Sequence, residues 1–173
     1  SALERSAQKL SKIMNRLVEK GRINSDTSDS IQERICYSHS LSDFSYCDLV
    51  IEAIVERLDI KKDLFEQLED VVSQDAILAT NTSSLAVTAI AAACTHPERV
   101  IGLHFFNPAP LMALVEVVPA MQTDSSIVDH CFSLMKSWDR VPVLAKDTPG
   151  FIVNRLARPF YGEALRIYEE GIA

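Results

Sequence analysis

The sequence predicts an α/β fold, a partial doubly wound parallel sheet followed by the first long helix of an all-helical domain. Short apolar strands alternate with amphipathic helices between residues 47 and 145, the pattern of a largely parallel sheet. After Thr148-Pro149-Gly150, a single long helix is predicted to run to about Glu170, with Gly171 as its stop signal. The two parts are therefore expected to be 1–147 and 148–173.

The chain opens with a predicted helix. Apolar residues recur at helical spacing from Leu3 to Leu17, and Gly21 follows as a stop signal. Basic residues at spacings of three and four, Lys12 and Arg16 among them, share another stripe of the same helix. The polar segment 24–29 holds several candidate N-caps and predicts a second, short helix.

The following segment is predicted to contain five strands and three helices. The strands are expected at 47–55, 76–80, 100–105, 114–118 and 141–145. The helices are expected at 59–72, 87–93 and 125–138. Because the chain begins with a helix and not with a strand, we expect the sheet to lack a strand and turn that precede Ser1.

Composition narrows the class of protein. The 173 residues are enough for the core of one domain, and the net charge of −7 argues against a nucleic-acid partner, which requires a basic surface. No apolar run is long enough to cross a bilayer, so no membrane partner is expected. The four cysteines are scattered without a CxxC pair, which argues against a metal site and a disulfide framework. A reducing, cytoplasmic location is therefore expected.

A glycine-rich turn is the feature that the sequence lacks. A dinucleotide site needs such a turn after the first strand, because the backbone must approach the pyrophosphate at a helix N-terminus. None of the five glycines belongs to such a turn. Two explanations are open at this point: the domain binds no dinucleotide, or the turn preceded Ser1.

Two neighbouring strands carry the candidate catalytic pair. His104 lies near the carboxyl end of strand 100–105, where α/β folds place their sites, although a lone histidine is more often a core residue bonded to a backbone carbonyl. Glu116 lies in the next apolar strand, where it is costly to bury without a partner unless it points to water from an edge strand. Because consecutive strands are usually neighbours, we expect the two side chains to pair for general acid–base chemistry.

Other polar residues follow the strands at the same edge. The hydroxyls of 81–84 could bind a substrate oxygen, but their position alone favours capping of the next helix. Asn154, in the first turn of the last helix, has the same two interpretations. Glu56 and Lys61 follow the first strand, and their spacing alone favours a solvated helix start.

The chain contains, in this order, the runs LVIEAIVERLDIKKDLF, NTSSL, GLHFFNPAPLMALVEVV and DTPGFIVNRL. This combination resembles the L-3-hydroxyacyl-CoA dehydrogenases over nearly the whole chain, most closely the bacterial type that acts on 3-hydroxybutyryl-CoA or in phenylacetate breakdown. The resemblance implies that 1–147 is an NAD-binding Rossmann domain without its GxGxxG segment. It also implies that 148–173 begins a helical dimerisation domain, and hence a homodimer.

The resemblance further implies a reaction, the NAD-dependent oxidation of the 3-hydroxyl of an acyl-CoA substrate to a ketone. His104 of HFFNP corresponds to the catalytic base, and Glu116 of LVEVV corresponds to its partner. Ser83 of NTSS and Asn154 of FIVNR correspond to contacts with the substrate oxygen. Many members have lysine where this chain has Ala113, which bears on substrate fit and not on the type of reaction.

Binding residues follow from the same resemblance. The residues that correspond to contacts with the nicotinamide nucleotide are Glu56, Lys61, Ser83 and Asn107. Arg16 and Lys12 on the first helix correspond more weakly to contacts with the CoA phosphates. Two alternatives remain open: a related NAD-dependent hydroxyacid dehydrogenase, and a non-catalytic homologue with a structural or interaction role. Without the phosphate turn, the chain alone is expected to be inactive.

Overall fold

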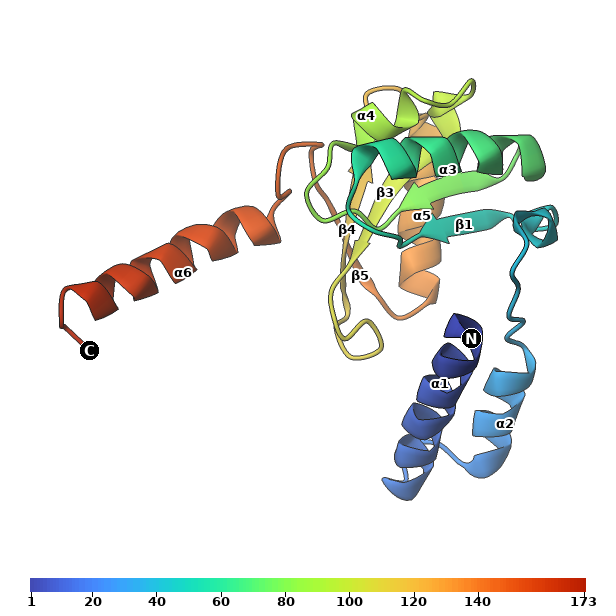
Figure 1. Ribbon diagram of the computed structural model, residues 1–173, viewed down its shortest axis with the longest axis horizontal. Helices are drawn as coiled ribbons and strands as arrows, with labels where there is room; N and C mark the ends of the chain where they lie inside the picture. Colours follow the sequence, from blue (N-terminus) through green and yellow to red (C-terminus); the bar gives the residue numbers. More distant parts are fainter. The chain divides into compact units, whose positions relative to one another are not determined.

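The computed structural model describes all 173 residues and divides the chain into two compact units, Ser1–Asp43 and Phe44–Ala173 (Figure 1). The first unit is a pair of helices, α1 (Ala2–Glu19) and α2 (Ser25–Glu33). A capping box between Ser1 and Glu4 begins α1, and the side chain of Asn24 caps α2 by accepting from the Thr27 amide at 2.7 Å. Both predicted helices are therefore present.

The second unit holds the sheet and four helices. Its strands are β1 (Leu49–Glu52), β2 (Ile77–Thr80), β3 (Val100–Phe105), β4 (Leu114–Pro119) and β5 (Val141–Leu144). Its helices are α3 (Leu58–Val71), α4 (Val87–Ala91), α5 (Ser125–Ser137) and α6 (Val153–Glu169). Short 3-10 turns lie at Leu41–Phe44 and Pro97–Arg99.

The sheet has the order β1-β2-β3-β4-β5, and every neighbouring pair except β3–β4 is parallel. This confirms the predicted α/β class with a largely parallel sheet. The β3–β4 pair is antiparallel because the segment 106–113 contains no crossover helix, which a parallel connection would need. The antiparallel register places His104 directly opposite Glu116.

Helices cover both faces of the sheet. Figure 1 shows α3 and α4 on one side of it and α5 on the other. The core on the α5 side joins Ile101, Leu103 and Val117 of the sheet to Cys131 and Met135 of the helix, all of them buried. All four residues of β2 are buried, as expected for a central parallel strand covered on both faces.

Several elements begin or end one to three residues from the predicted bounds, and for two of them the structure shows a local reason. The first strand was expected at 47–55 but ends at Glu52, whose carboxylate Oε1 accepts from the Ile54 amide at 2.6 Å and turns the chain out of the sheet. The last helix was expected from residue 151 but begins at Val153. The helix begins two residues later because Gly150 and Phe151 have φ angles of 77° and 47°, in the left-handed region, which is not helical backbone.

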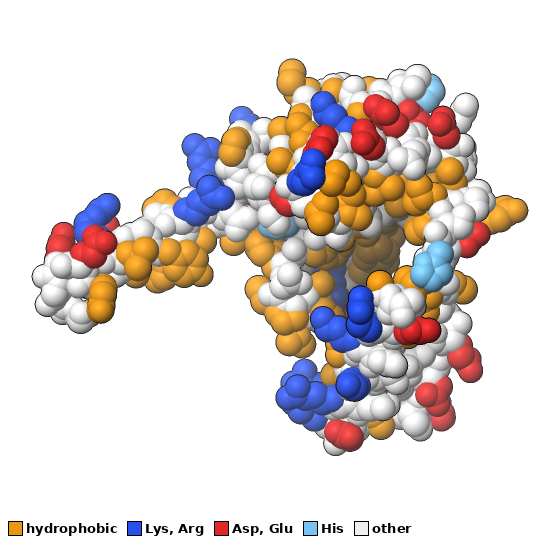
Figure 2. All heavy atoms as spheres, viewed as in Figure 1, with side chains coloured by type: hydrophobic (Ala, Val, Ile, Leu, Met, Phe, Trp, Pro, Cys, Tyr) orange, Lys and Arg blue, Asp and Glu red, His pale blue; other side chains and the backbone are white.

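Apolar side chains line the exposed surface of α6, where none of its residues is buried (Figure 2). The large exposed ones on this helix are Leu156, Phe160, Tyr161, Leu165 and Tyr168. No helix in the structure has both the length and the apolar character needed to cross a membrane.

Gly102 provides a test of the packing between β3 and α4. A Cβ atom there would lie 2.9 Å from both Val118 Cβ and Val87 Cγ2, so we expect Gly102→Ala to cost about 1–3 kcal/mol of unfolding free energy by overpacking. Gly162 on α6 is the matched control, because an added Cβ there meets nothing within 4 Å. Gly162→Ala should be neutral or stabilising by up to about 1 kcal/mol in denaturant unfolding. Equal effects of the two substitutions would contradict the tight contact.

Candidate active site

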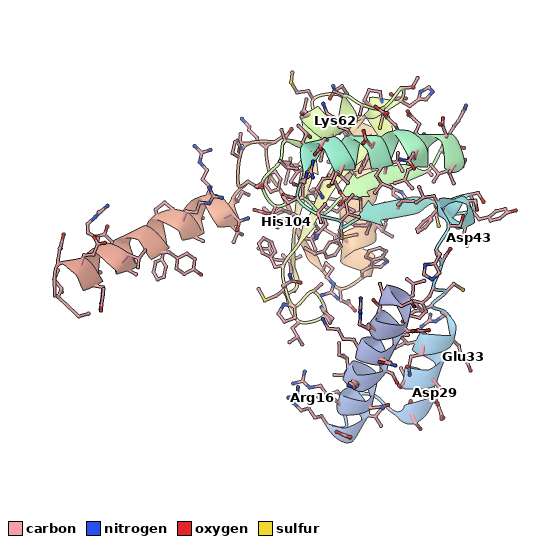
Figure 3. All side chains as sticks on the ribbon, in the orientation of Figure 1. Arg16, Asp29, Glu33, Asp43, Lys62 and His104 are labelled. Carbon is pink, nitrogen blue, oxygen red and sulfur yellow. The ribbon has the colours of Figure 1, made fainter.

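Polar residues gather where β1, β2 and β3 end. The three strands are parallel, so the loops after Glu52, Thr80 and Phe105 emerge at one edge of the sheet. The linker between β5 and α6 reaches the same edge, because Asn154 in the first turn of α6 contacts the loop after β2. His104, labelled in Figure 3, is the second-last residue of β3 and lies at this edge.

His104 and Glu116 form the centre of the cluster. His104 Nδ1 lies 2.7 Å from Glu116 Oε2, and the two residues are 4% and 1% exposed. The other ring nitrogen, Nε2, lies 3.1 Å from Ser83 Oγ. The expected pairing is thus present, and the alternatives of a solvent-facing glutamate and of a histidine bonded to a backbone carbonyl are wrong.

The second oxygen of Glu116 is also occupied. Oε1 accepts from the backbone amides of Ile152 and Val153, at 2.9 Å each. These amides lie at the start of α6, where unpaired N–H groups and the helix dipole favour negative charge. Three donors therefore offset the cost of burying this carboxylate, which would be large if it had no partner.

Two phenyl rings flank the imidazole. The ring centroid of His104 lies 4.6 Å from that of Phe106 and 5.6 Å from that of Phe151. Phe151 is 3% exposed although its backbone is in the left-handed region, which costs of order 1–3 kcal/mol for a residue with a side chain. The rings shield the His–Glu pair from water and leave Nε2 directed at Ser83.

The Ser83 loop, residues 81–86, is held by a carboxylate from another loop. Glu56 Oε1 accepts from Thr82 Oγ1 at 2.6 Å, from the Ser83 amide at 3.0 Å, and from the amide and hydroxyl of Ser84 at 3.1 Å each. On the other side, Asn154 Nδ2 donates to the Ser83 carbonyl at 3.2 Å. The capping interpretation of these serines is wrong, since no side chain of this loop caps α4.

A buried ion pair lies beneath Glu56. Lys61 Nζ lies 2.6 Å from Glu52 Oε1 and 3.3 Å from Glu56 Oε2, and its side chain is only 1% exposed. Thr80 Oγ1 donates to the remaining oxygen of Glu52 at 2.7 Å. The interpretation of Lys61 as part of a solvated helix start is therefore wrong. Sequence reasoning missed Glu52, although an acidic residue inside the apolar run LVIEAIV is the same signal that identified Glu116.

The environment of Glu56 controls its ionisation. Burial raises the pKa of this carboxyl, but the hydrogen bonds from Thr82, Ser83 and Ser84 and the charge of Lys61 outweigh burial and lower the pKa to about 2. Glu56 is therefore ionised at neutral pH and able to accept all of these donors at once.

Three other predicted binding residues are exposed. Asn107 is exposed in the loop after β3 and makes no side-chain hydrogen bond to the cluster. Arg16, which is labelled in Figure 3, is exposed on α1 in the first unit, and Lys12 is exposed on the same helix. In contrast, Asn81 was predicted only as part of the polar segment 81–84, without a role of its own. Its Oδ1 accepts from the Phe105 amide at 2.8 Å and joins the ends of β2 and β3.

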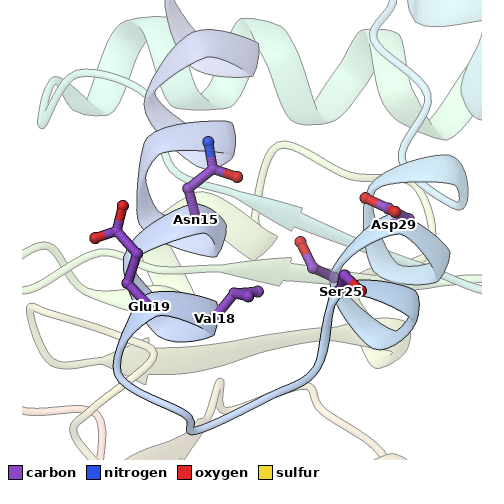
Figure 4. Close-up of a pocket in the computed structure, with 6 residues that line it drawn as sticks. Asn15, Val18, Glu19, Ser25 and Asp29 are labelled. Carbon is purple, nitrogen blue, oxygen red and sulfur yellow. The ribbon is translucent and has the colours of Figure 1, made fainter.

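The surface has two hollows, one in each unit. One, of about 290 Å³, lies between α1 and α2 and is lined by polar residues that include Asn15, Glu19 and Asp29 (Figure 4). The other, of about 340 Å³, is lined by residues that include Asp48 and His130, at the opposite edge of the sheet from His104. No cluster of histidine, cysteine and acidic residues that could hold a metal ion is present in the chain.

A comparison with models of protein families identifies the family of the chain. Residues 1–148 match the model described as the NAD binding domain of 3-hydroxyacyl-CoA dehydrogenase. The chain belongs to the 3-hydroxyacyl-CoA dehydrogenase family. The resemblance seen in the four sequence runs is thereby confirmed.

Individual relatives agree with the family assignment. The chain is 46% identical to 3-hydroxyadipyl-CoA dehydrogenase of Escherichia coli (strain K12), covering 99% of this chain and 36% of that protein. It is 42% identical to 3-hydroxybutyryl-CoA dehydrogenase of Clostridioides difficile, covering 99% of this chain and 61% of that protein. The crystal structure of (S)-3-hydroxybutyryl-CoA dehydrogenase from Ralstonia eutropha superposes with a TM-score of 0.95 at 35% identity, over 99% of this chain and 61% of that one. The chain therefore spans only part of the length of these relatives.

The low pKa of Glu56 predicts how the Ser83 loop responds to acid. A carboxyl whose pKa falls from 4.5 to about 2 on folding contributes stability above about pH 4.5, and this contribution is lost as the pH falls toward 2. Glu56→Gln should therefore lower the unfolding free energy at neutral pH and flatten its decline below pH 4.5. Glu163→Gln on α6 is the control, because this side chain is 57% exposed. An unchanged acid slope in Glu56→Gln would refute the role of this carboxylate.

Proposed function

We propose that the complete protein carrying this chain oxidises the 3-hydroxyl of an L-3-hydroxyacyl-CoA to a 3-ketoacyl-CoA, with NAD as the hydride acceptor. One observation carries the proposal: a buried imidazole, held by a carboxylate on one nitrogen, presents its other nitrogen to a serine hydroxyl at 3.1 Å. This is the arrangement that a general base needs in order to take a proton from an alcohol. The family of the chain supports the same reaction.

The residues at this edge of the sheet fit the nicotinamide end of NAD. They lie at the carboxyl ends of parallel strands, where doubly wound folds bind nucleotides, and Glu56 is ionised and 38% exposed. We assign Glu56, Ser83 and Asn107 to this end of the cofactor. Lys61 is buried, and we assign it to the ion pair that supports Glu56 there. When bound, NAD supplies the acceptor for the hydride that leaves the substrate carbon. The five glycines form no phosphate-binding turn, so no residue of this chain is assigned to the pyrophosphate.

The proton path follows from the hydrogen bonds of His104. Glu116 is a carboxylate that accepts from two backbone amides, so Nδ1 of His104 must carry the hydrogen in the contact at 2.7 Å. Nε2 then has a free lone pair and accepts from Ser83 Oγ. A substrate hydroxyl placed at Nε2 would lose its proton to that nitrogen, and Glu116 would stabilise the resulting imidazolium.

The substrate oxygen would lie close to fixed donors. Ser83 Oγ and the amide group of Asn154 both come to this side of His104, and Asn154 is itself anchored on the Ser83 carbonyl. Donors that are already in place stabilise charge that changes on an oxygen without a cost of reorganisation. We therefore assign Ser83 and Asn154 to the substrate oxygen.

The wider organisation is part of the same proposal. The family match to 1–148 supports residues 1–147 as the NAD-binding domain, and the exposed apolar side chains of α6 support 148–173 as the start of a helical domain that forms a homodimer. Arg16 and Lys12, exposed on α1, are assigned to the phosphates of CoA. Four free cysteines support a reducing, cytoplasmic location.

His104→Gln in the complete protein should lower kcat by about 10²- to 10⁴-fold, because the general base is lost. The KM for the acyl-CoA should change little, since His104 is not assigned to CoA binding. The measurement is the rate of acetoacetyl-CoA reduction followed by NADH absorbance. His130→Gln on the exposed surface of α5 is the control and should keep the wild-type rate.

The same assay decides between this proposal and its alternatives. Near-normal turnover of His104→Gln would remove the histidine from the mechanism. Wild-type protein that turns over free hydroxyacids but not acyl-CoA thioesters would indicate a related dehydrogenase instead. Absence of any NAD-dependent turnover would favour a non-catalytic homologue.

A further inference from the structure

We propose that Asp147 is a positioning residue that fixes the linker between β5 and α6 and thereby holds Glu116 and Ser83 in place for His104. The inference rests on the proposed function for its catalytic consequence, and on the structure alone for the clamp itself. Asp147 lies in the 145–152 linker, 60 residues from the helix that it contacts.

The contact is a bidentate cap. Asp147 Oδ1 accepts from the Val87 amide at 2.9 Å and Oδ2 accepts from the Thr88 amide at 2.7 Å, at the first turn of α4. The residue at the N-cap position, Ala86, has no side-chain oxygen and makes no such bond. Asp147 therefore supplies from a distance the cap that the local sequence lacks, with a charged acceptor that suits a helix N-terminus.

The elements on either side of the linker hold it weakly. The strand before it, β5, is an edge strand with mostly exposed residues, and the helix after it, α6, has no buried residue. α4 is firmly seated by contrast, because Val87 and Ile90 are fully buried. The bond from Asp147 thus ties a linker whose flanking elements are largely exposed to a well-packed helix.

The position of the linker matters because it places hydrogen-bond donors in the site. Its end supplies the amides of Ile152 and Val153, which bind Glu116, and the next residue, Asn154, binds the Ser83 carbonyl. The linker also holds two successive residues in the left-handed region, Gly150 and Phe151, which an unanchored segment would relax.

The clamp joins the two sides of the site. α4 follows directly after the Ser83 loop, so Asp147 ties that loop and the start of α6 to a common point. Loss of the clamp would let the Glu116 donors and Ser83 move relative to His104. Misplacement by about 1 Å from a distant change is enough to cost about 10²-fold in rate.

The test compares Asp147→Asn with Asp124→Asn in the complete protein. Asp124 is the matched control, because its side chain caps α5 by accepting from the Ser126 amide at 2.7 Å, next to the start of β3 at the opposite edge of the sheet. Asparagine keeps one acceptor but turns its NH₂ group toward the second amide. Hydrogen exchange of the Ile152 and Val153 amides should accelerate at least about tenfold in Asp147→Asn, and should not change in Asp124→Asn.

Kinetics supply the second measurement. Asp147→Asn should lower kcat at least about tenfold and leave the KM values for acyl-CoA and NAD within about twofold, at a temperature where both variants are folded. Asp124→Asn should keep the wild-type kcat. If both variants lose only thermal stability, with equal exchange and equal kcat, Asp147 is an ordinary cap and the proposal is overturned.

Misfolding of the variant and absence of activity in the wild-type protein can each be distinguished from failure of the proposal. If Asp147→Asn does not fold, Asp147→Ser is the second variant, because it removes one of the two acceptors without placing an NH₂ group against an amide. An unchanged exchange rate of the Ile152 and Val153 amides in Asp147→Ser overturns the clamp. If the wild-type protein shows no dehydrogenase activity, the proposed function fails, and the exchange comparison alone decides the proposal about Asp147.

Discussion

The site depends on one buried carboxylate. Glu116 lies in the interior of the sheet at 1% exposure, where an ionised group is unstable without partners. It has three donors: His104 from the neighbouring strand, and the Ile152 and Val153 amides from the start of α6. The carboxylate therefore joins the sheet, the imidazole of His104 and the segment that follows the sheet in one interaction.

A second acidic residue organises the other side. Glu56 collects four hydrogen bonds from the Ser83 loop with one oxygen, and its other oxygen faces Lys61. Lys61 is buried and divides its charge between Glu56 and Glu52. Hydrogen bonds to ions are stronger than those between neutral groups, so this network holds Ser83 firmly opposite His104. The two glutamates, 56 and 116, thus fix the serine and the histidine from opposite sides.

Much of this could be predicted from the sequence. The periodicity of apolar residues predicted the alternation of strands and helices. A single carboxylate inside an apolar strand predicted the pair of Glu116 with His104, and the same signal is present at Glu52. The rest depended on tertiary structure. The burial of Lys61 comes from its helix lying over Glu52, and the cap of α4 comes from Asp147, which no local pattern connects to it. Backbone amides such as those of Ile152 and Val153 leave no trace in the sequence at all.

The most direct test of this account is the tautomer of His104. In ¹⁵N-histidine NMR spectra of the complete protein at neutral pH, we expect a single tautomer for His104 with the hydrogen on Nδ1 and a lone pair on Nε2. That state is required if Glu116 accepts from Nδ1 and Nε2 is to take a proton from the substrate. A hydrogen found on Nε2, or rapid averaging of the two tautomers as in an exposed histidine, would contradict the account.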